Sequence, residues 1–69
     1  MKISVNGEEK LLKLTNKVSN LSFILKNLGY KSKTIVVELN NLIVNSDQWE
    51  IEMVKDGDKL EIVSIVGGG

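Results

Sequence analysis

The sequence contains no cysteine and no histidine, and these two absences narrow the chemistry that the chain can perform. Without cysteine it can form neither a disulfide nor a thiolate metal site. Without histidine it lacks the commonest general base and the commonest transition-metal ligand, which excludes a conventional Ser–His–Asp triad. The glycines at positions 7, 29 and 57 are isolated, so no phosphate-binding G-x-G-x-x-G pattern is present either.

The chain also lacks an excess of charge of either sign and any long apolar run. Its 9 basic and 9 acidic residues give a formal net charge of zero. Nucleic-acid binders usually carry a basic excess, because neutralising phosphates supplies much of their affinity. The apolar runs are only a few residues long, and the N-terminal residues alternate instead of forming a signal peptide. We therefore expect a cytoplasmic protein that binds neither nucleic acid nor a membrane.

The pattern that is present predicts a β-hairpin at the start of the chain. Lys2 to Asn6 alternates polar and apolar residues, as a half-buried strand does. Asn6-Gly7 is a strong signal for a two-residue turn, because both positions of such a turn need a positive φ. Lys10 to Leu14 is then the returning strand, with Leu12 and Leu14 facing inward.

An amphipathic helix is predicted next. Apolar residues recur at spacings of three and four from Val18 to Leu28, which places them on one helical face. Thr15-Asn16 offers side-chain oxygens that can cap the first turn. Gly29 provides the expected stop in the left-handed conformation.

The second half of the chain has the composition of strands and turns. In order, the expected elements are a strand over Thr34–Leu39, a turn at Asn40-Asn41, a short strand over Leu42–Val44, a helical turn over Ser46–Trp49, a tight turn at Asp56–Asp58 and a strand over Lys59–Val66. One sheet with one helix across it buries the apolar faces of so few elements most simply. We predict an α+β fold with a mixed sheet of four to five strands, in which the first and last strands run parallel at the centre. Residues 1–66 would form the domain and residues 67–69 a flexible tail.

Three acids lie close together near the last turn, and they allow two interpretations. Asp56, Asp58 and Glu61 could bind a hard cation or act as acid and base. An Asp-Gly-Asp sequence between two strands is, however, first of all turn chemistry. We predict a turn and no metal site. Phe23 and Trp49 are interpreted as packing anchors.

The glycine run Gly67-Gly68-Gly69 is the most informative feature of the sequence. It has no side chains, so it can enter a narrow channel that any other residue would block. It also presents a single reactive group, the α-carboxylate of Gly69, which suggests that the terminus itself is a substrate. The alternative is an ordinary disordered end or an engineered linker.

The order of elements, together with the glycine terminus, resembles the ubiquitin-like β-grasp fold and, within it, the ThiS family of sulfur carriers in thiamin thiazole biosynthesis. The resemblance covers the whole chain and rests on these residues: Val5-Asn6-Gly7, the helix pattern of Val18–Leu28, Val37–Asn40, Trp49, Asp56-Gly57-Asp58 with Leu60–Ile62, and Gly68-Gly69. The chain departs from the family pattern in its third glycine and in Lys17, which stands where a small hydroxyl residue is frequent.

The resemblance implies a carrier and not an enzyme. A separate ATP-dependent activating enzyme of the ThiF type would adenylate Gly69. A persulfide donor would then supply the sulfur of a terminal thiocarboxylate, and a thiazole synthase of the ThiG type would accept it. No cofactor intrinsic to the chain is implied, since ATP is used by the activating enzyme.

A docking face for these partners can be predicted from strand alternation. If the helix covers Leu60 and Ile62, then Val63 and Ile65 point to the open face of the sheet, where Val36 can join them. We predict that Val36, Val63, Ile65 and Val66 form the partner-docking surface, because exposed apolar clusters mark interaction sites. The alternatives are strand propensity alone or self-association.

Two other functions stay open at this point. The related small subunit of molybdopterin synthase has a similar fold and tail, but it is usually longer and has prolines near the tail, whereas this chain has none. A ubiquitin-like interaction module with an idle tail is the second alternative.

Overall fold

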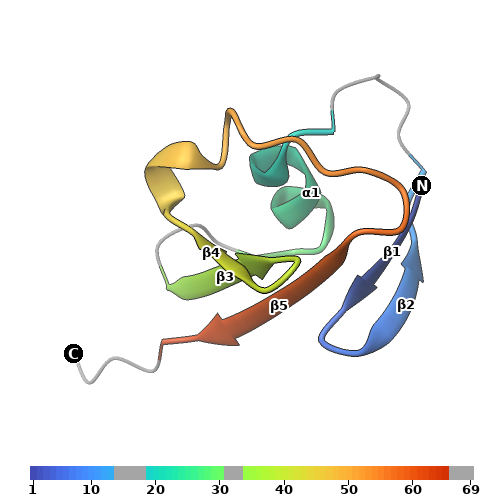
Figure 1. Cartoon of the computed structure of the whole chain (residues 1–69), viewed down its shortest axis with the longest axis horizontal. Coiled ribbons are helices and arrows are strands. Elements are labelled where there is room, and N and C mark those ends of the chain that lie inside the picture. Colours follow the sequence, from blue (N-terminus) through green and yellow to red (C-terminus); the bar gives the residue numbers. More distant parts are fainter. Residues whose placement is uncertain (14–18, 31–33, 66–69) are drawn as a thin grey trace.

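A five-stranded mixed sheet with one helix across one face forms the structure, a computed structural model that describes residues 1–13, 19–30 and 34–65 (Figure 1). The elements in chain order are β1 (Lys2–Val5), β2 (Glu8–Leu11), α1 (Leu21–Asn27), β3 (Ile35–Leu39), β4 (Leu42–Val44), the 3-10 turn η1 (Ser46–Gln48) and β5 (Lys59–Ser64). The predicted α+β architecture is confirmed.

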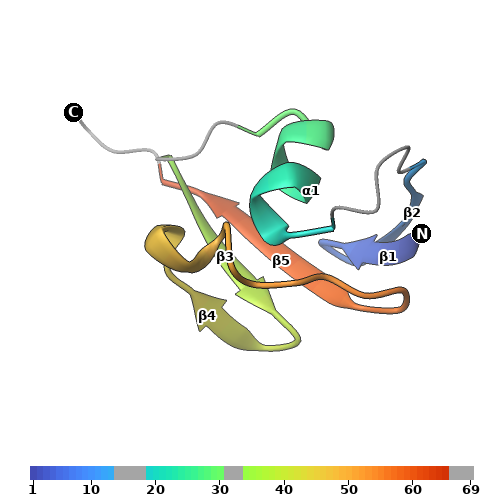
Figure 2. The ribbon, with the colours of Figure 1, turned by 90° about the horizontal axis from the view of Figure 1, so that it is seen from above.

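The last strand lies at the centre of the sheet. The strand order is β2-β1-β5-β3-β4. β1 runs parallel to β5, with Ser4 opposite Lys59 and Val5 opposite Leu60, and every other neighbouring pair is antiparallel. The predicted parallel pairing of the first and last strands is confirmed. Seen from above, α1 crosses one face of this sheet (Figure 2).

Both predicted two-residue turns are present, and both are built from left-handed residues. Asn6 has a φ of 51° and Gly7 one of 83°, while Asn40 and Asn41 have φ values of 50° and 73°. Asparagine tolerates this region better than most residues because its short polar side chain can hydrogen-bond locally. These turns fix the registers of their hairpins, so that Val5 pairs with Glu8 and Leu39 with Leu42.

The returning strand of the first hairpin differs from the prediction. It spans Glu8–Leu11 instead of Lys10–Leu14, because a two-residue turn pairs the residues on either side of it at once. Leu11 is exposed, whereas Leu12 packs partly buried against the core as expected. Leu14 lies outside the described residues. β5 likewise ends at Ser64, and Val66 lies outside the described residues.

The prediction for the start of the helix was wrong. α1 begins at Leu21, and Asn20 caps it: its Oδ1 accepts the Phe23 N–H at 2.8 Å. The Nδ2 of Asn20 donates to the Glu50 carbonyl at 3.2 Å, which ties the same residue to the loop after η1. Because the same side chain caps the helix and contacts a distant loop, the start of the helix is determined by tertiary structure as well as by local capping. Thr15, Asn16 and Val18 lie outside the described residues.

The predicted stop of the helix at Gly29 is confirmed. Gly29 has a φ of 89°. The Gly29 N–H donates to the Lys26 carbonyl and the Tyr30 N–H to the Leu25 carbonyl, both at 3.0 Å. This pair of bonds is the Schellman motif, which satisfies carbonyls at the end of a helix.

The core lies between α1 and the inner face of the sheet. Its buried side chains are Ile3, Val5, Leu21, Ile24, Leu25, Ile35, Val37, Leu39, Trp49, Val54, Leu60 and Ile62. Trp49 is buried, and its Nε1–H donates to the Val44 carbonyl at 2.9 Å. It therefore anchors η1 to β4, as predicted. Phe23 is only partly buried.

The double role of Asn20 leads to a testable prediction. Asn20→Ala removes the cap of the helix and its link to the loop, so we expect the free energy of unfolding to fall by about 1–2 kcal/mol in urea denaturation. Asn27→Ala is the control, because Asn27 lies in the same helix, is exposed, and its Nδ2 donates to the Phe23 carbonyl within that helix. Its loss should stay below about 0.5 kcal/mol. Equal losses in the two variants would contradict the assignment.

Candidate functional site

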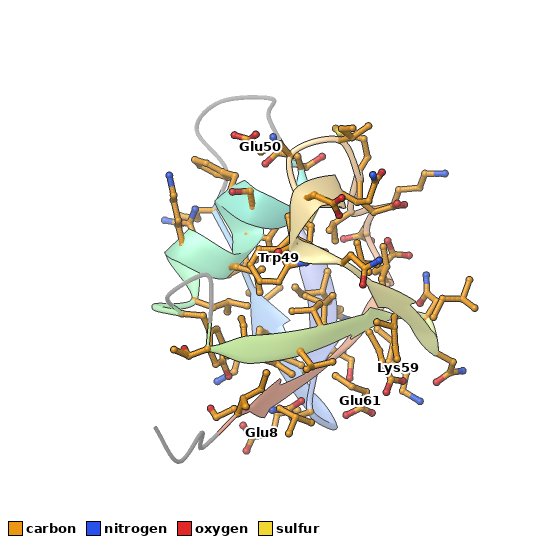
Figure 3. The ribbon with its side chains drawn as sticks, turned by 90° about the vertical axis from the view of Figure 1, so that its left-hand side faces the viewer. Glu8, Trp49, Glu50, Lys59 and Glu61 are labelled. Atoms are coloured by element: carbon orange, nitrogen blue, oxygen red, sulfur yellow. The ribbon has the colours of Figure 1, made fainter. Side chains whose placement is uncertain are left out.

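The two faces of β5 have different environments, because α1 covers one face and leaves the other open. Leu60 and Ile62 point toward α1 and are 0% and 6% exposed. Since successive side chains of a strand alternate, Lys59, Glu61 and Val63 point to the other face. Figure 3 shows Lys59 and Glu61 on the side of the sheet away from the helix. No described element covers this open face.

Four apolar side chains meet on the open face, and we call them the apolar patch: Val36, Ile43, Val63 and Ile65. Their exposed fractions are 36%, 66%, 61% and 53%. Val36 lies directly opposite Val63 in the β3–β5 ladder. The Ile65 N–H donates to the Thr34 carbonyl at 2.7 Å, so Ile65 continues the alternation beyond the end of β5. The predicted placement of Val36, Val63 and Ile65 on one exposed face is confirmed.

Ile43 belongs to the patch but was missed by the sequence analysis. It lies opposite Glu38, and Glu38 is two residues from Val36 on the same strand. All three therefore share the open face. The signal was available in the sequence: the two-residue turn at Asn40-Asn41 fixes which residues of β3 and β4 pair, and that register places Ile43 outward.

The rest of the open face is mainly polar, with one exposed apolar residue among the described ones, Leu11, opposite Lys2 on the edge strand β2 and so at the far side of the sheet from β3 and β4. Lys59 lies 3.9 Å from Glu61 and Lys2 lies 3.4 Å from Glu9, in exposed ion pairs. Such surface pairs add little stability. What matters here is where these charged residues lie, which is on β1, β2 and the first half of β5. The apolar patch is thereby restricted to the second half of β5 and its neighbours β3 and β4.

A surface groove borders the apolar patch at the β3–β4 side of the sheet. Its lining includes Val36, Ile43 and Ile65 from the patch, together with Asn45 and Trp49, which flank η1. The groove extends the patch around the end of the sheet. A partner surface that covers the patch can therefore also contact the segment next to Trp49.

The residues of the predicted tail follow the patch directly in the sequence. Ile65 is the last residue that the structure describes, and Gly67 follows it after one residue. Val66, Gly67, Gly68 and Gly69 lie outside the described residues, so their predicted roles remain predictions. The structure adds that two of the four patch residues, Val63 in β5 and Ile65 just after it, lie on the segment that leads to the tail.

The acids of the last turn hold the turn together. Asp56 Oδ1 accepts the Lys2 N–H at 2.6 Å, and Asp58 Oδ2 accepts the Lys55 N–H at 2.7 Å. Asp58 Oδ1 also accepts from the Asn40 side-chain amide at 3.1 Å. These bonds support the interpretation as turn chemistry.

Within residues 1–13, 19–30 and 34–65, no three potential metal ligands gather into a group. In the same ranges, no helix has the length and apolar character to cross a membrane.

Comparison with known proteins agrees with this geometry. The model of the ThiS family matches residues 3–69. The chain belongs to the ThiS family. The crystal structure of the thiamine biosynthesis protein ThiS from Geobacter metallireducens superimposes with a TM-score of 0.82 at 28% identity, covering 100% of both chains. The predicted family and the predicted ubiquitin-like β-grasp fold are therefore confirmed.

The curated relatives fall into two kinds. An uncharacterised protein named ycf40 from Trieres chinensis is 42% identical over 65 residues, which are 94% of this chain and 85% of that protein. A thiazole synthase from Paramagnetospirillum magneticum is 42% identical over 69 residues, which are 100% of this chain and 20% of that protein. The ThiS chain thus corresponds to about one fifth of a larger thiazole synthase.

Adjacent residues of β5 provide a test of the two faces. Ile62→Ala should lower the free energy of unfolding by about 2–4 kcal/mol, because it opens a cavity under α1. Val63→Ala, one residue further along the same strand, should cost less than about 1 kcal/mol, since its side chain is exposed. Chemical denaturation of both variants checks this. A loss for Val63→Ala as large as that for Ile62→Ala would show that the open face is part of the stabilising structure.

Proposed function

We propose that this ThiS-family chain is a sulfur carrier in the formation of the thiazole of thiamin, with the carboxylate of Gly69 as the group that is modified. The observation that carries the proposal is the continuity of β5. One strand is anchored in the core, presents Val63 on the apolar patch and leads after a few residues to Gly67-Gly68-Gly69. A partner that docks on the patch is thereby positioned to receive the tail.

The chemistry at Gly69 needs a separate enzyme. A carboxylate at neutral pH is a poor electrophile. Attack of a Gly69 carboxylate oxygen on the α-phosphorus of ATP gives an acyl-adenylate and releases pyrophosphate. A persulfide sulfur then attacks the acyl carbon, and AMP leaves. Cleavage of the resulting acyl disulfide by a thiol gives the terminal thiocarboxylate. None of these steps requires a catalytic side chain from this protein.

The partner that accepts the sulfur is proposed to be a thiazole synthase. Two thiazole synthases, from Paramagnetospirillum magneticum and Magnetococcus marinus, match this chain over 69 residues each, at 42% and 29% identity. Each match covers 20% of the larger protein. A region similar to this chain within a thiazole synthase supports a functional link between the two.

This link favours the thiamin pathway over molybdopterin synthesis. The choice is tested by asking whether the chain restores growth of a thiamin-requiring strain or the activity missing in a molybdenum-cofactor-deficient strain.

The modification at Gly69 can be measured directly. The protein is incubated with ATP, a ThiF-type activating enzyme and a persulfide donor, and its intact mass is determined. We expect one oxygen to be replaced by sulfur, localised to Gly69. Deleting Gly69, or adding one residue after it, should abolish the change while leaving the thermal melting curve unaltered. Sulfur transfer to either variant would refute the proposed role of the terminus.

The role of the apolar patch needs a separate experiment. Val63→Asp places a charge at the centre of the patch, so we expect the KM of the activating enzyme for the carrier to rise by about tenfold or more. Ile51→Asp is the matched control, because Ile51 is also exposed, at 69%, but lies in the loop after η1 and outside the sheet. Its KM should stay within about twofold of the wild type. Equal effects of the two changes would mean that docking does not use the patch.

A further inference from the structure

The second half of β5 is flanked by a strand on one side only. β1 pairs with β5 at Lys59 and Leu60, whereas β3 pairs with β5 as far as Ser64. The bonds from the Asn40 N–H to the Lys59 carbonyl and from the Ile65 N–H to the Thr34 carbonyl show which residues of β5 face β3. By alternation, the backbone groups of Leu60, Ile62 and Ser64 face the β1 side. Beyond Leu60, that side has no strand among the described residues.

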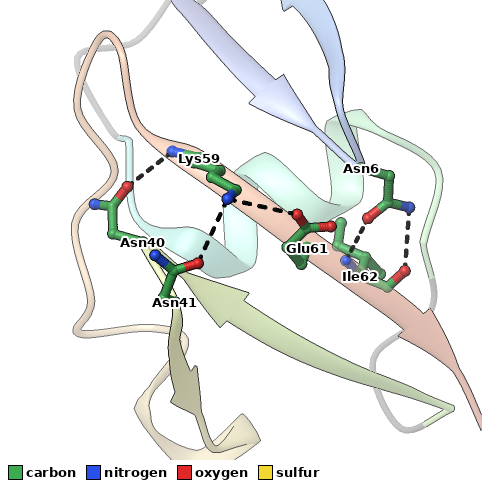
Figure 4. Close-up of polar contacts among 6 residues, drawn as sticks. All are labelled: Asn6, Asn40, Asn41, Lys59, Glu61 and Ile62. Atoms are coloured by element: carbon green, nitrogen blue, oxygen red, sulfur yellow. Dashed lines mark hydrogen bonds and ion pairs between the residues drawn. The ribbon is translucent and has the colours of Figure 1, made fainter.

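The side chain of Asn6 lies beside β5 on its β1 side, just beyond the point where β1 stops pairing with it. Its Oδ1 accepts the Ile62 N–H at 2.6 Å, and its Nδ2 donates to the Ile62 carbonyl at 3.1 Å (Figure 4). The backbone N–H of Asn6 donates to the Leu60 carbonyl at 2.9 Å. A side-chain amide carries the same donor and acceptor as a peptide group. Asn6 therefore extends the ladder along β5 by one step, although its own backbone has already turned away with a φ of 51°.

We propose that Asn6 is a positioning residue, which holds the second half of β5 in the sheet and so sets the direction in which the tail reaches its partner. This inference rests on the function proposed above. In the part of the chain that the structure describes, Asn6 makes the last hydrogen bonds to the β1 side of β5 before Ile65. Without them, the strand beyond Leu60 is held at one edge only and can pivot about β3. Small errors in the placement of a reacting group can cost large factors in rate.

The opposite end of β5 contains a matched control. Asn40 also follows a strand, has a φ of 50°, and accepts a β5 backbone N–H through its Oδ1, that of Lys59 at 3.0 Å. The two asparagines differ in the part of β5 that they contact. Asn40 binds Lys59, the first residue of β5, whereas Asn6 binds Ile62, three residues nearer to the tail. Loss of either side chain weakens the sheet, but only the loss of Asn6 frees the end that leads to Gly69.

The experiment compares Asn6→Gly with Asn40→Gly. Glycine removes the side chain and still accepts a positive φ, so the turns are retained. Both variants are assayed for adenylation by a ThiF-type enzyme at a temperature where melting curves show them folded. We expect kcat to fall about tenfold for Asn6→Gly. KM should rise by less than the tenfold expected for Val63→Asp, because all four patch side chains are retained, although the segment that carries Val63 and Ile65 is held less firmly. For Asn40→Gly, both constants should stay within about twofold of the wild type.

Amide exchange gives a readout that does not depend on the proposed function. The Ile62 N–H should exchange about tenfold faster in Asn6→Gly than in Asn40→Gly, because its acceptor is removed in the first variant only. Equal exchange, or equal kcat in the two variants, would overturn the positioning role. If the wild-type chain itself is not adenylated by an enzyme that is active on another ThiS carrier, the proposed function fails, and the exchange rates still decide whether Asn6 holds the strand.

Discussion

The structure depends on the two ladders that flank β5. β1 pairs with one edge of this strand and β3 with the other, so β5 links the hairpins β1–β2 and β3–β4 within the described sheet. The same strand places Leu60 and Ile62 under the helix and Val63 on the open face. One segment of six residues therefore contributes both to the core and to the exposed apolar patch.

Three asparagine side chains among the described residues replace missing backbone partners. Asn6 and Asn40 bind the backbone of β5 where the neighbouring strands turn away, and Asn20 binds the first turn of α1 together with the carbonyl of Glu50. In each case a side-chain amide supplies a donor or acceptor that no strand or helix provides there. Such residues are polar and partly exposed, yet they determine where the regular elements begin and end.

Local signals in the sequence were sufficient for the turns and for the general arrangement of the sheet, but they misplaced the returning strand of the first hairpin and the start of the helix. Asn6-Gly7 and Asn40-Asn41 form their turns through local backbone geometry, so the turns and the faces of Val63 and Val36 followed from the sequence. The cap at Asn20 did not, because it is selected by a contact with Glu50, 30 residues away in the chain. The side-chain bridge from Asn6 to Ile62, across 56 residues, is equally non-local.

The position of β5 in the chain also has a consequence for folding. The central strand is the last of the described strands along the chain, so this sheet cannot close until β5 has left the ribosome. Each hairpin can form earlier from neighbouring residues, but β1 and β3 then expose the edges that β5 later fills. Contacts between distant residues slow folding, and unpaired edges favour association with other chains. The newly made chain is therefore most exposed to aggregation in the interval before its last strand is inserted.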